Sequence, residues 1–254
     1  MSTVFITGAT KNTGYSIACK FASEGFDVAV SSMDGARAQA AAEKLEKQYG
    51  VKTKGYMLDI RNVDRIREVF DEIKKDFGGL DTFVANGAAL GVGQDLLSVS
   101  IEEYDDVMNT NLRGTYFCCQ CAAKIMKEAN KGSIVIISSV HSHEAIWGRS
   151  LYTASKGGLN ALARSIAIEL GPYNVRANSI IAGAIKTDRW NDFTEEEIQK
   201  RRENWPIGLE STGEDIANGA YYLGTDLSKT VTGTELTIDS GVLISLLPFK
   251  GGKH

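Results

Sequence analysis

The stretch Thr3-Val4-Phe5-Ile6-Thr7-Gly8-Ala9-Thr10-Lys11-Asn12-Thr13-Gly14 decides the fold of this chain. Its first five residues form a largely apolar, β-branched run that predicts a strand, and a helical pattern follows from Thr13 to Ser23. The turn between them consists mainly of small residues. Such a turn lets the free N–H groups at a helix N-terminus approach the pyrophosphate of a dinucleotide closely. The sequence therefore predicts a dinucleotide-binding unit here, in preference to an ordinary glycine-containing turn.

The rest of the chain repeats the alternation of strand and helix. Strands are predicted over Thr3–Thr7, Asp27–Ser32, Lys52–Leu58, Thr82–Ala85, Ser133–Ser138, Val175–Ile180 and Glu235–Ile238. Helices are predicted over Thr13–Ser23, Gly35–Tyr49, Val63–Phe77, Glu102–Glu128, Tyr152–Leu170, Glu195–Glu203 and Asp215–Leu223. Most strands are apolar nearly throughout, as in parallel strands covered on both faces. We therefore predict an α/β fold, a doubly wound, seven-stranded parallel sheet flanked by helices, in one domain spanning residues 1–254.

Composition excludes several classes of protein. The chain has 254 residues, of which 43% are hydrophobic and 24% charged, and its net charge is −4. It is too hydrophobic to be disordered, and no apolar run reaches the ~18 residues of a membrane span. The N-terminus lacks the basic and apolar segments of a secretory signal. Because a mildly acidic chain has no broad attraction for nucleic acid, we expect a cytoplasmic protein with a small-molecule substrate and neither a nucleic-acid nor a membrane partner.

The four cysteines carry little chemistry. Cys118, Cys119 and Cys121 share one predicted helix, and Cys19 lies on another. This spacing fits neither a disulfide framework nor a zinc site. We expect buried, reduced thiols and no bound metal.

The end of the second strand bears on the choice of cofactor. Ser32 stands where NAD-preferring units carry an acid that binds the ribose hydroxyls, whereas Asp34 lies two residues further on. Lys11 and Arg37 are positioned to neutralise a 2′-phosphate. We therefore favour NADP and keep NAD as the alternative, because Asp34 remains able to serve NAD.

A second group of polar residues predicts the chemistry. Ser139 follows a strand at the carboxyl edge of the sheet, Tyr152 comes thirteen residues later, and Lys156 follows Tyr152 by four. Tyr152 and Lys156 therefore share one face of a helix. A tyrosine with a pKa near 10 is a poor acid or base at neutral pH, but a neighbouring ammonium and a positively charged nicotinamide lower its pKa. Together with the first turn, the three residues form a specific set.

This set resembles the short-chain dehydrogenase/reductase family in its compact, one-domain form, from the first strand to about Gly241. The resemblance implies a Rossmann-like fold and an NAD(P)-dependent oxidoreductase that interconverts a secondary alcohol and a ketone. It implies that Tyr152 is the general acid/base, that Lys156 lowers its pKa and binds the nicotinamide ribose, and that Ser139 orients the reacting oxygen. It also implies that Asn111 positions a water in the proton relay.

The resemblance assigns the cofactor contacts as well. It places Asp59 and Ile60 near adenine, and Ile185 and Thr187 near the nicotinamide carboxamide. The complete set of predicted cofactor-binding residues is Gly8, Lys11, Asn12, Thr13, Gly14, Ser32, Met33, Asp59, Ile60, Asn86, Gly87, Ala88, Tyr152, Lys156, Gly183, Ile185 and Thr187.

Three positions depart from the family pattern. Asn12 replaces the middle glycine of the first turn, Ala85-Asn86-Gly87-Ala88 replaces Asn-Asn-Ala-Gly, and Ala182 replaces the proline before Gly183. Asn tolerates left-handed backbone conformations, so we expect the turn to survive and the Asn12 side chain to add a cofactor contact. No departure removes a catalytic group.

Residues 182–213 are expected to form a loop or lid over the substrate. Polar and aromatic side chains that are candidates to face the substrate are His141, His143, Trp147, Trp190 and Trp205. They suit a polyhydroxy compound such as a sugar, sugar acid or polyol, with an apolar ketone such as a steroid as the alternative. His141 and His143 alternate, so only one of them faces the site if the loop is extended.

Three competing activities share this fold. A halohydrin dehalogenase would carry Arg in place of Lys156, and an enoyl-thioester reductase spaces its Tyr and Lys more widely. A non-catalytic nucleotide sensor would be expected to lack Tyr152 or Lys156. The resemblance also implies a homotetramer, in which the predicted helices Glu102–Glu128 and Tyr152–Leu170 pair across one interface and the apolar tail Val242–Phe249 lies near another.

Overall fold

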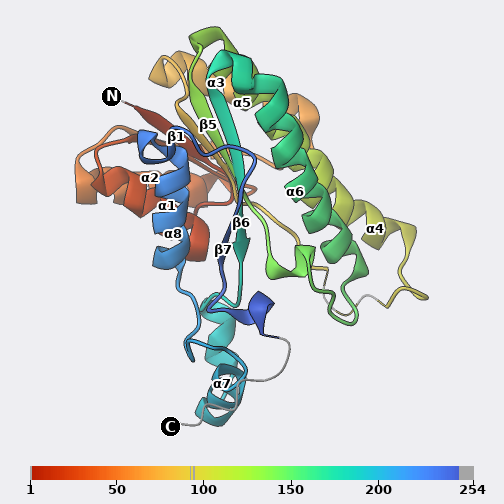
Figure 1. Ribbon diagram of the computed structural model, residues 1–254. Coiled ribbons are helices and arrows are strands. Elements are labelled where there is room, and N and C mark those ends of the chain that lie inside the picture. Colours follow the sequence, from red (N-terminus) through yellow and green to blue (C-terminus); the bar gives the residue numbers. More distant parts are fainter. Residues whose placement is uncertain (1, 92, 94, 246–254) are drawn as a thin grey trace.

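A single parallel sheet organises the chain, shown in Figure 1 as a computed structural model that describes residues 2–91, 93 and 95–245. The strand order is β3-β2-β1-β4-β5-β6-β7. The strands are β1 (Thr3–Ile6), β2 (Asp27–Ser32), β3 (Thr53–Met57), β4 (Thr82–Ala85), β5 (Gly132–Ile137), β6 (Val175–Ala182) and β7 (Glu235–Ile238). The predicted doubly wound, Rossmann-like sheet is therefore confirmed.

Helices cover both faces of this sheet, and two apolar cores separate it from them (Figure 1). One face carries α1 (Asn12–Ser23), α2 (Gly35–Tyr49) and α8 (Gly213–Gly224), and the other carries α3 (Val63–Phe77), α5 (Thr115–Ala129) and α6 (Ser150–Leu170). The alternation of side chains along β1 explains the division. Phe5 lies in the core beneath α3, whereas Val4 and Ile6 lie in the core beneath α1. Both cores need apolar residues, which is why the strands are apolar on both faces.

The order of the strands creates a ligand site at one edge. Successive strands are added outward from β1 to β3, and then in the opposite direction from β4 to β7. The carboxyl ends of β1 and β4 therefore meet where the connections diverge, and α/β proteins bind ligands at such a point.

One predicted helix is interrupted. The pattern over 102–128 becomes α4 (Ile101–Met108), a π-helical turn over Asn109–Gly114, and α5. A Cβ at Gly114 would lie 2.5 Å from the carbonyl oxygen of Ile60, so this turn packs closely against the chain after β3. Single π turns occur frequently at functional sites, and this one contains Asn111.

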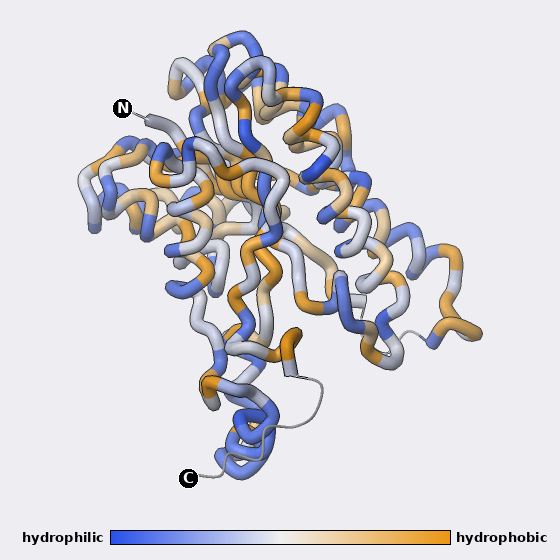
Figure 2. The backbone as a smooth tube through the Cα atoms, in the orientation of Figure 1, coloured by the Kyte–Doolittle hydropathy of each residue, from blue (hydrophilic) through white to orange (hydrophobic). Residues whose placement is uncertain are grey.

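The segment 182–213 extends beyond the carboxyl edge of the sheet. It contains a 3-10 turn over Asp188–Asp192 and helix α7 (Glu195–Arg202), which buries none of its residues. Figure 2 shows α7 as hydrophilic along most of its length, in contrast to the strands. No helix in the described ranges is long and apolar enough to cross a membrane. Cys118, Cys119 and Cys121 are buried, and none of the four cysteines forms a disulfide.

Candidate active site

The first turn adopts the backbone conformation that the sequence predicts. Gly8 has a φ of 63° and Asn12 a φ of 49°, so both lie in the left-handed region. Asn12 begins α1, and the helix N-terminus at Asn12–Gly14 points its free N–H groups toward the carboxyl edge of β1. The Asn12 side chain also contacts the segment 182–213, because its Oδ1 accepts a hydrogen bond of 3.4 Å from the backbone N–H of Asp188.

Asn86 fastens this turn to the end of β4. Its Nδ2 donates hydrogen bonds of 3.1 Å to the carbonyl oxygens of both Thr7 and Gly8. Thr7 Oγ1 in turn accepts from the backbone N–H groups of Asn86 at 3.0 Å and Gly87 at 3.2 Å. These bonds hold the two strand ends of the ligand site in a fixed relationship.

A cavity of about 150 Å³ brings the predicted catalytic residues together. Ser139, Tyr152 and Lys156 line it. Six of the other predicted cofactor residues share its walls: Thr13, Asn86, Ala88, Gly183, Ile185 and Thr187. Its wall also contains Arg189, which is not among the residues predicted from the sequence. The sequence could have indicated it, because Arg189 is a charged residue two positions after Thr187.

Lys156 is buried at the floor of this site. Its side chain is 3% exposed, and Nζ donates a hydrogen bond of 2.7 Å to the carbonyl oxygen of Ile137. Nζ lies 5.6 Å from the centre of the Tyr152 ring. Burial lowers the pKa of Lys156 to about 8, because the protein interior disfavours the ammonium form.

The pKa of Tyr152 differs from the expectation. Burial raises it above the ordinary value, while a hydrogen bond with Ser139 and the charges of Arg149 and Arg189 oppose that rise. Lys156 is not among the groups that lower this pKa. In the protein alone, desolvation is thus the largest influence on Tyr152.

Asn111 is fully buried and uses its side chain within the protein. Its Oδ1 accepts from the N–H of Ala89 at 2.7 Å, and its Nδ2 donates to Ala89 O at 2.8 Å and to Ser155 Oγ at 3.1 Å. The side chain therefore holds the π turn against α6 and the chain after β4. Because these bonds occupy the side chain, Asn111 can contact a relay water only through its backbone.

His141 and His143 point to different neighbours, as expected for an extended loop, although the backbone here forms a turn. A 3-10 turn over Val140–Ser142 places the His141 ring edge-on to Tyr152, with ring centres 6.2 Å apart. His143 instead lies 2.7 Å from Glu235 at the start of β7. The structure thus brings His141 to Tyr152 and His143 to Glu235.

Two of the three tryptophans that were predicted to face the substrate pack against other aromatic side chains. Trp190 is buried, and its ring centre lies 6.1 Å from that of Trp205 and 6.0 Å from that of Phe193. Trp147 is 84% exposed. None of the three tryptophans is among the described residues that line the catalytic cavity. Trp190 and Trp205 therefore anchor the segment that carries Arg189.

The adenosine end of the predicted site is more open. Asp34 Oδ1 caps α2 by accepting from the N–H of Arg37 at 3.1 Å, and its Oδ2 lies 3.2 Å from the Arg37 guanidinium. Ser32 Oγ accepts from the N–H of Asp34 at 3.2 Å. Met33 is 66% exposed, and the Lys11 ammonium has no hydrogen-bond or ion-pair partner among the described residues. No acidic side chain at this strand end is therefore free of the protein's own contacts.

Asp59 is also committed, because its carboxylate accepts a forked pair of hydrogen bonds from Arg61. Arg61 holds the pKa of Asp59 below its usual range. Ile60, which follows it, packs against the apolar core beneath α3.

Two features test whether a dinucleotide fits the cavity. Thr187 Oγ1 is buried and has no hydrogen-bond partner in the part of the chain that the structure describes, although it lies in the cavity wall where the sequence predicts a nicotinamide contact. Gly14 has no room for a Cβ, which would lie 2.3 Å from Gly8 O, so the backbone of the first turn is packed as tightly as a phosphate-binding turn requires. The residues present fit the group.

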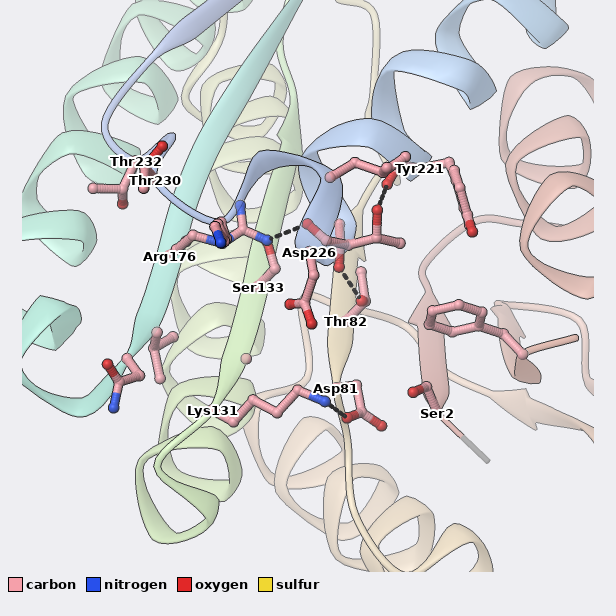
Figure 3. A pocket seen from close by; sticks show the side chains of 18 of the residues that line it. Ser2, Asp81, Thr82, Lys131, Ser133, Arg176, Tyr221, Asp226, Thr230 and Thr232 are labelled. Carbon is pink, nitrogen blue, oxygen red and sulfur yellow. Dashed lines mark hydrogen bonds and ion pairs between the residues drawn. The ribbon is translucent and has the colours of Figure 1, made fainter. Parts of the chain in front are cut away.

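A larger depression of about 900 Å³ lies at the opposite, amino edge of the sheet. Figure 3 shows that several of its polar side chains bond to the protein itself. Arg176 donates to the carbonyl oxygens of Leu223 and Thr225, Thr82 donates to that of Gly224, and Lys131 pairs with an acid of the same rim. These bonds fasten the end of α8 to the sheet and explain the polar lining without a ligand.

Comparisons with known proteins agree with this geometry. A family model described as enoyl-(acyl carrier protein) reductase matches residues 8–243. The 3-oxoacyl-[acyl-carrier-protein] reductase FabG of Aquifex aeolicus is 34% identical over 239 residues, which cover 93% of this chain and 95% of that protein. The sorbose reductase SOU1 of Candida albicans is 32% identical over 243 residues, covering 93% and 85%.

Solved structures show the same fold. A short-chain type dehydrogenase/reductase from Mycobacterium marinum superposes with a TM-score of 0.86 at 27% identity, covering 96% of each chain. A variant of ElxO with NADPH bound superposes with a TM-score of 0.89 at 27% identity, covering 96% of this chain and 99% of that one.

Fold and site together define a nucleotide-binding oxidoreductase of the α/β type. The chain belongs to the short-chain dehydrogenase/reductase family. It is accordingly an NAD(P)-dependent enzyme that acts on alcohol and carbonyl groups.

Proposed function

We propose that this enzyme interconverts a secondary alcohol and a ketone on a polar, polyhydroxy substrate, with Tyr152 as the general acid/base. The observation that carries the proposal is the shared cavity of Ser139, Tyr152 and Lys156 at the carboxyl edge of the sheet. The sorbose reductase relative supports a polyhydroxy substrate.

In this mechanism the chain positions groups and moves one proton. When bound, the nicotinamide supplies or accepts the hydride at the substrate carbon. Tyr152 protonates the carbonyl oxygen during reduction and removes the hydroxyl proton during oxidation. Ser139 orients that oxygen by a hydrogen bond, and Lys156 binds the nicotinamide ribose. Ser139, Arg149 and Arg189 favour the phenolate. Asn111 acts as a positioning residue by fixing the π turn beside α6.

The cofactor is proposed to lie with its pyrophosphate at Gly8–Gly14 and its nicotinamide near Thr187. We propose NADP as the preferred form, because Ser32 presents no carboxylate to a 2′-phosphate and Lys11 is a cation without a partner among the described residues. The NADPH-bound relative is consistent with this preference. The Asp34 carboxylate already bonds to Arg37 and to the α2 backbone, which argues against its binding the ribose hydroxyls of NAD.

A 3-oxoacyl thioester is the second candidate substrate, because FabG of Aquifex aeolicus is 34% identical to this chain. Its reduction uses the same Tyr152 chemistry. The reduction of an enoyl C=C bond, which the family model's description names, is disfavoured by the four-residue spacing of Tyr152 and Lys156. An apolar ketone fits the polar cavity wall less well.

We further propose a homotetramer in a reducing compartment such as the cytoplasm. Apolar side chains are exposed along α4, α5 and α6, notably Tyr104, Tyr116 and Ile168, and Ile168 is 80% exposed. Covering them in a subunit contact would remove this surface from water. The four free cysteines suit a reducing compartment. Of the apolar tail Val242–Phe249, residues 246–249 lie outside the described residues.

The test is NAD(P)H absorbance with a panel of polyols, sugar acids, 3-oxoacyl thioesters and apolar ketones. We expect turnover of polyhydroxy members and loss of at least about 10³-fold in the Tyr152→Phe variant, which keeps the fold and cofactor affinity. Wild-type turnover by Tyr152→Phe would overturn the role of the tyrosine. Cofactor binding without turnover of any member would instead support a nucleotide sensor.

A further inference from the structure

Two arginines near the reacting oxygen lack the partners that the other arginines have. Elsewhere in the chain each guanidinium contacts a carboxylate, a backbone carbonyl or an aromatic ring: Arg37, Arg61, Arg65, Arg67, Arg113, Arg164, Arg176, Arg201 and Arg202. The guanidinium groups of Arg149 and Arg189 have neither a hydrogen bond, an ion pair nor a ring contact within the described ranges. Among the described arginines, these two are the ones whose guanidinium the protein leaves without a partner.

Both unpaired arginines act on the catalytic tyrosine. Arg189 lines the same cavity as Ser139 and Tyr152, and Arg149 precedes the first residue of α6, three positions before Tyr152. Each charge lowers the pKa of Tyr152, whereas no carboxylate among the described residues shifts it. The reacting end of the cavity is therefore an electropositive region.

The segment that carries Arg189 is held in place. Trp190 packs against Trp205 and Phe193, and Asn12 accepts the backbone N–H of Asp188. Arg189 thus lies between two fixed neighbours, and its backbone is positioned at the cavity although its side chain is exposed. A guanidinium presented in this way suits bidentate recognition of a carboxylate or phosphate.

We propose that Arg189 binds an anionic group of the substrate next to the reacting carbon, with Arg149 adding to the positive field. This inference rests on the proposed function and narrows its polyhydroxy substrate to an acid, such as a sugar acid or a phosphorylated polyol. The cavity of about 150 Å³ leaves little space between Arg189 and Tyr152, which places the anion close to the reacting carbon. Neutral polyols leave the guanidinium unpaired and are poorer substrates.

The experiment compares six-carbon compounds that differ in charge: the neutral polyol sorbitol, the sugar acid gluconate and the phosphorylated polyol sorbitol 6-phosphate, each with NADP. We expect wild-type kcat/KM to be about tenfold or more higher for one of the anionic compounds, and the better anion identifies carboxylate or phosphate. Arg189→Gln should lower kcat/KM for that anion about 10- to 100-fold, mainly through KM, and lower that for sorbitol by a clearly smaller factor, so that the ratio of anionic to neutral kcat/KM falls. Arg189→Lys should restore part of the loss.

Lys186→Met provides the matched control. Lys186 is a cation of the same segment, its Nζ lies 3.8 Å from Glu210, and it does not line the catalytic cavity. This variant should keep the wild-type ratio of anionic to neutral kcat/KM.

Three other outcomes would overturn the inference. Equal kcat/KM for neutral and charged substrates in the wild type would show that Arg189 does not form an anion site. Equal losses for both classes in Arg189→Gln, together with a shifted pH profile, would assign Arg189 to tuning Tyr152. A rise in KM for NADPH alone would assign it to the cofactor. If no compound of the broad panel is turned over, the proposed function fails and this inference fails with it.

Discussion

Lys156 Nζ donates a hydrogen bond of 2.7 Å to the carbonyl oxygen of Ile137, at the end of the strand that leads to Ser139. The bond joins the floor of the cavity to the strand that leads to the Ser139 hydroxyl in the cavity wall. It gives a buried ammonium one fixed acceptor and no carboxylate partner among the described residues. A charge buried in this way lowers the free energy of unfolding, and its removal should raise it.

The first prediction concerns stability and Lys156. Below pH 8 the folded and unfolded states both hold the lysine proton, so folding carries the full cost of burying the charge. Between the folded pKa of about 8 and the ordinary lysine pKa of 10.5 the unfolded state holds more protons, so this contribution to stability rises with pH. Lys156→Met should therefore be more stable than the wild type by up to about 3 kcal/mol at pH 7 and lose turnover.

Chemical denaturation of both proteins at pH 7, 8, 9 and 10 measures this difference, which should shrink as the pH rises. Lys186→Met serves as the control because its ammonium is largely exposed, and it should show no such trend. A difference that is constant with pH would show that packing, rather than charge burial, separates the two proteins.

The second prediction concerns Gly14. A Cβ there would lie 2.3 Å from Gly8 O and 2.6 Å from Asn86 Nδ2, so Gly14→Ala must displace backbone of the first turn. We expect a loss of about 1–3 kcal/mol in unfolding free energy and weaker NADP binding, measured by denaturation and titration calorimetry.

Gly157→Ala is its matched control. The nearest atom to a Cβ at Gly157 is Ser142 O at 3.8 Å, and the residue lies inside α6. This substitution should be neutral or stabilise the protein by about 0.5–1 kcal/mol. Equal effects of the two substitutions would contradict tight packing at the first turn.

The third prediction concerns cofactor choice. Ser32→Asp places a carboxylate at the carboxyl end of β2, where it repels a 2′-phosphate and accepts from ribose hydroxyls. We expect kcat/KM with NADPH to fall at least tenfold, about 1.4 kcal/mol, and the ratio of NADH to NADPH activity to rise. The control Asp34→Asn keeps the Oδ1 atom that caps α2 and removes the charge. If Asp34→Asn selectively lost NADH activity, Asp34 would be the ribose ligand.

The fourth prediction concerns the contact between Asn12 of the first turn and Asp188 of the segment 182–213. Asn12→Gly removes the acceptor of the Asp188 N–H, yet glycine adopts the φ of 49° readily. The unfolding free energy should change by less than about 1 kcal/mol, whereas the Asp188 amide should exchange its hydrogen faster. Unchanged exchange at Asp188 would show that the tryptophan contacts alone hold this segment.

Local patterns determined most of the fold. The strands β1, β2 and β4 end within one residue of their predicted limits, because residues buried on both faces must be apolar throughout. Tyr152 and Lys156 meet at one cavity because a helix places residues four apart on one face. Asn12 takes the left-handed conformation that its residue type tolerates.

The tertiary structure alone decided which polar groups meet across the chain. Glu235 engages His143 from 92 residues away, and Asn12 accepts the N–H of Asp188 from 176 residues away. The burial that raises the pKa of Tyr152 likewise exists only in the folded chain. Hydrophobic periodicity and residue spacing report which face of an element is buried. Partner choice between elements depends on how the loops pack, and so Arg189 became visible at the active site only in the folded chain.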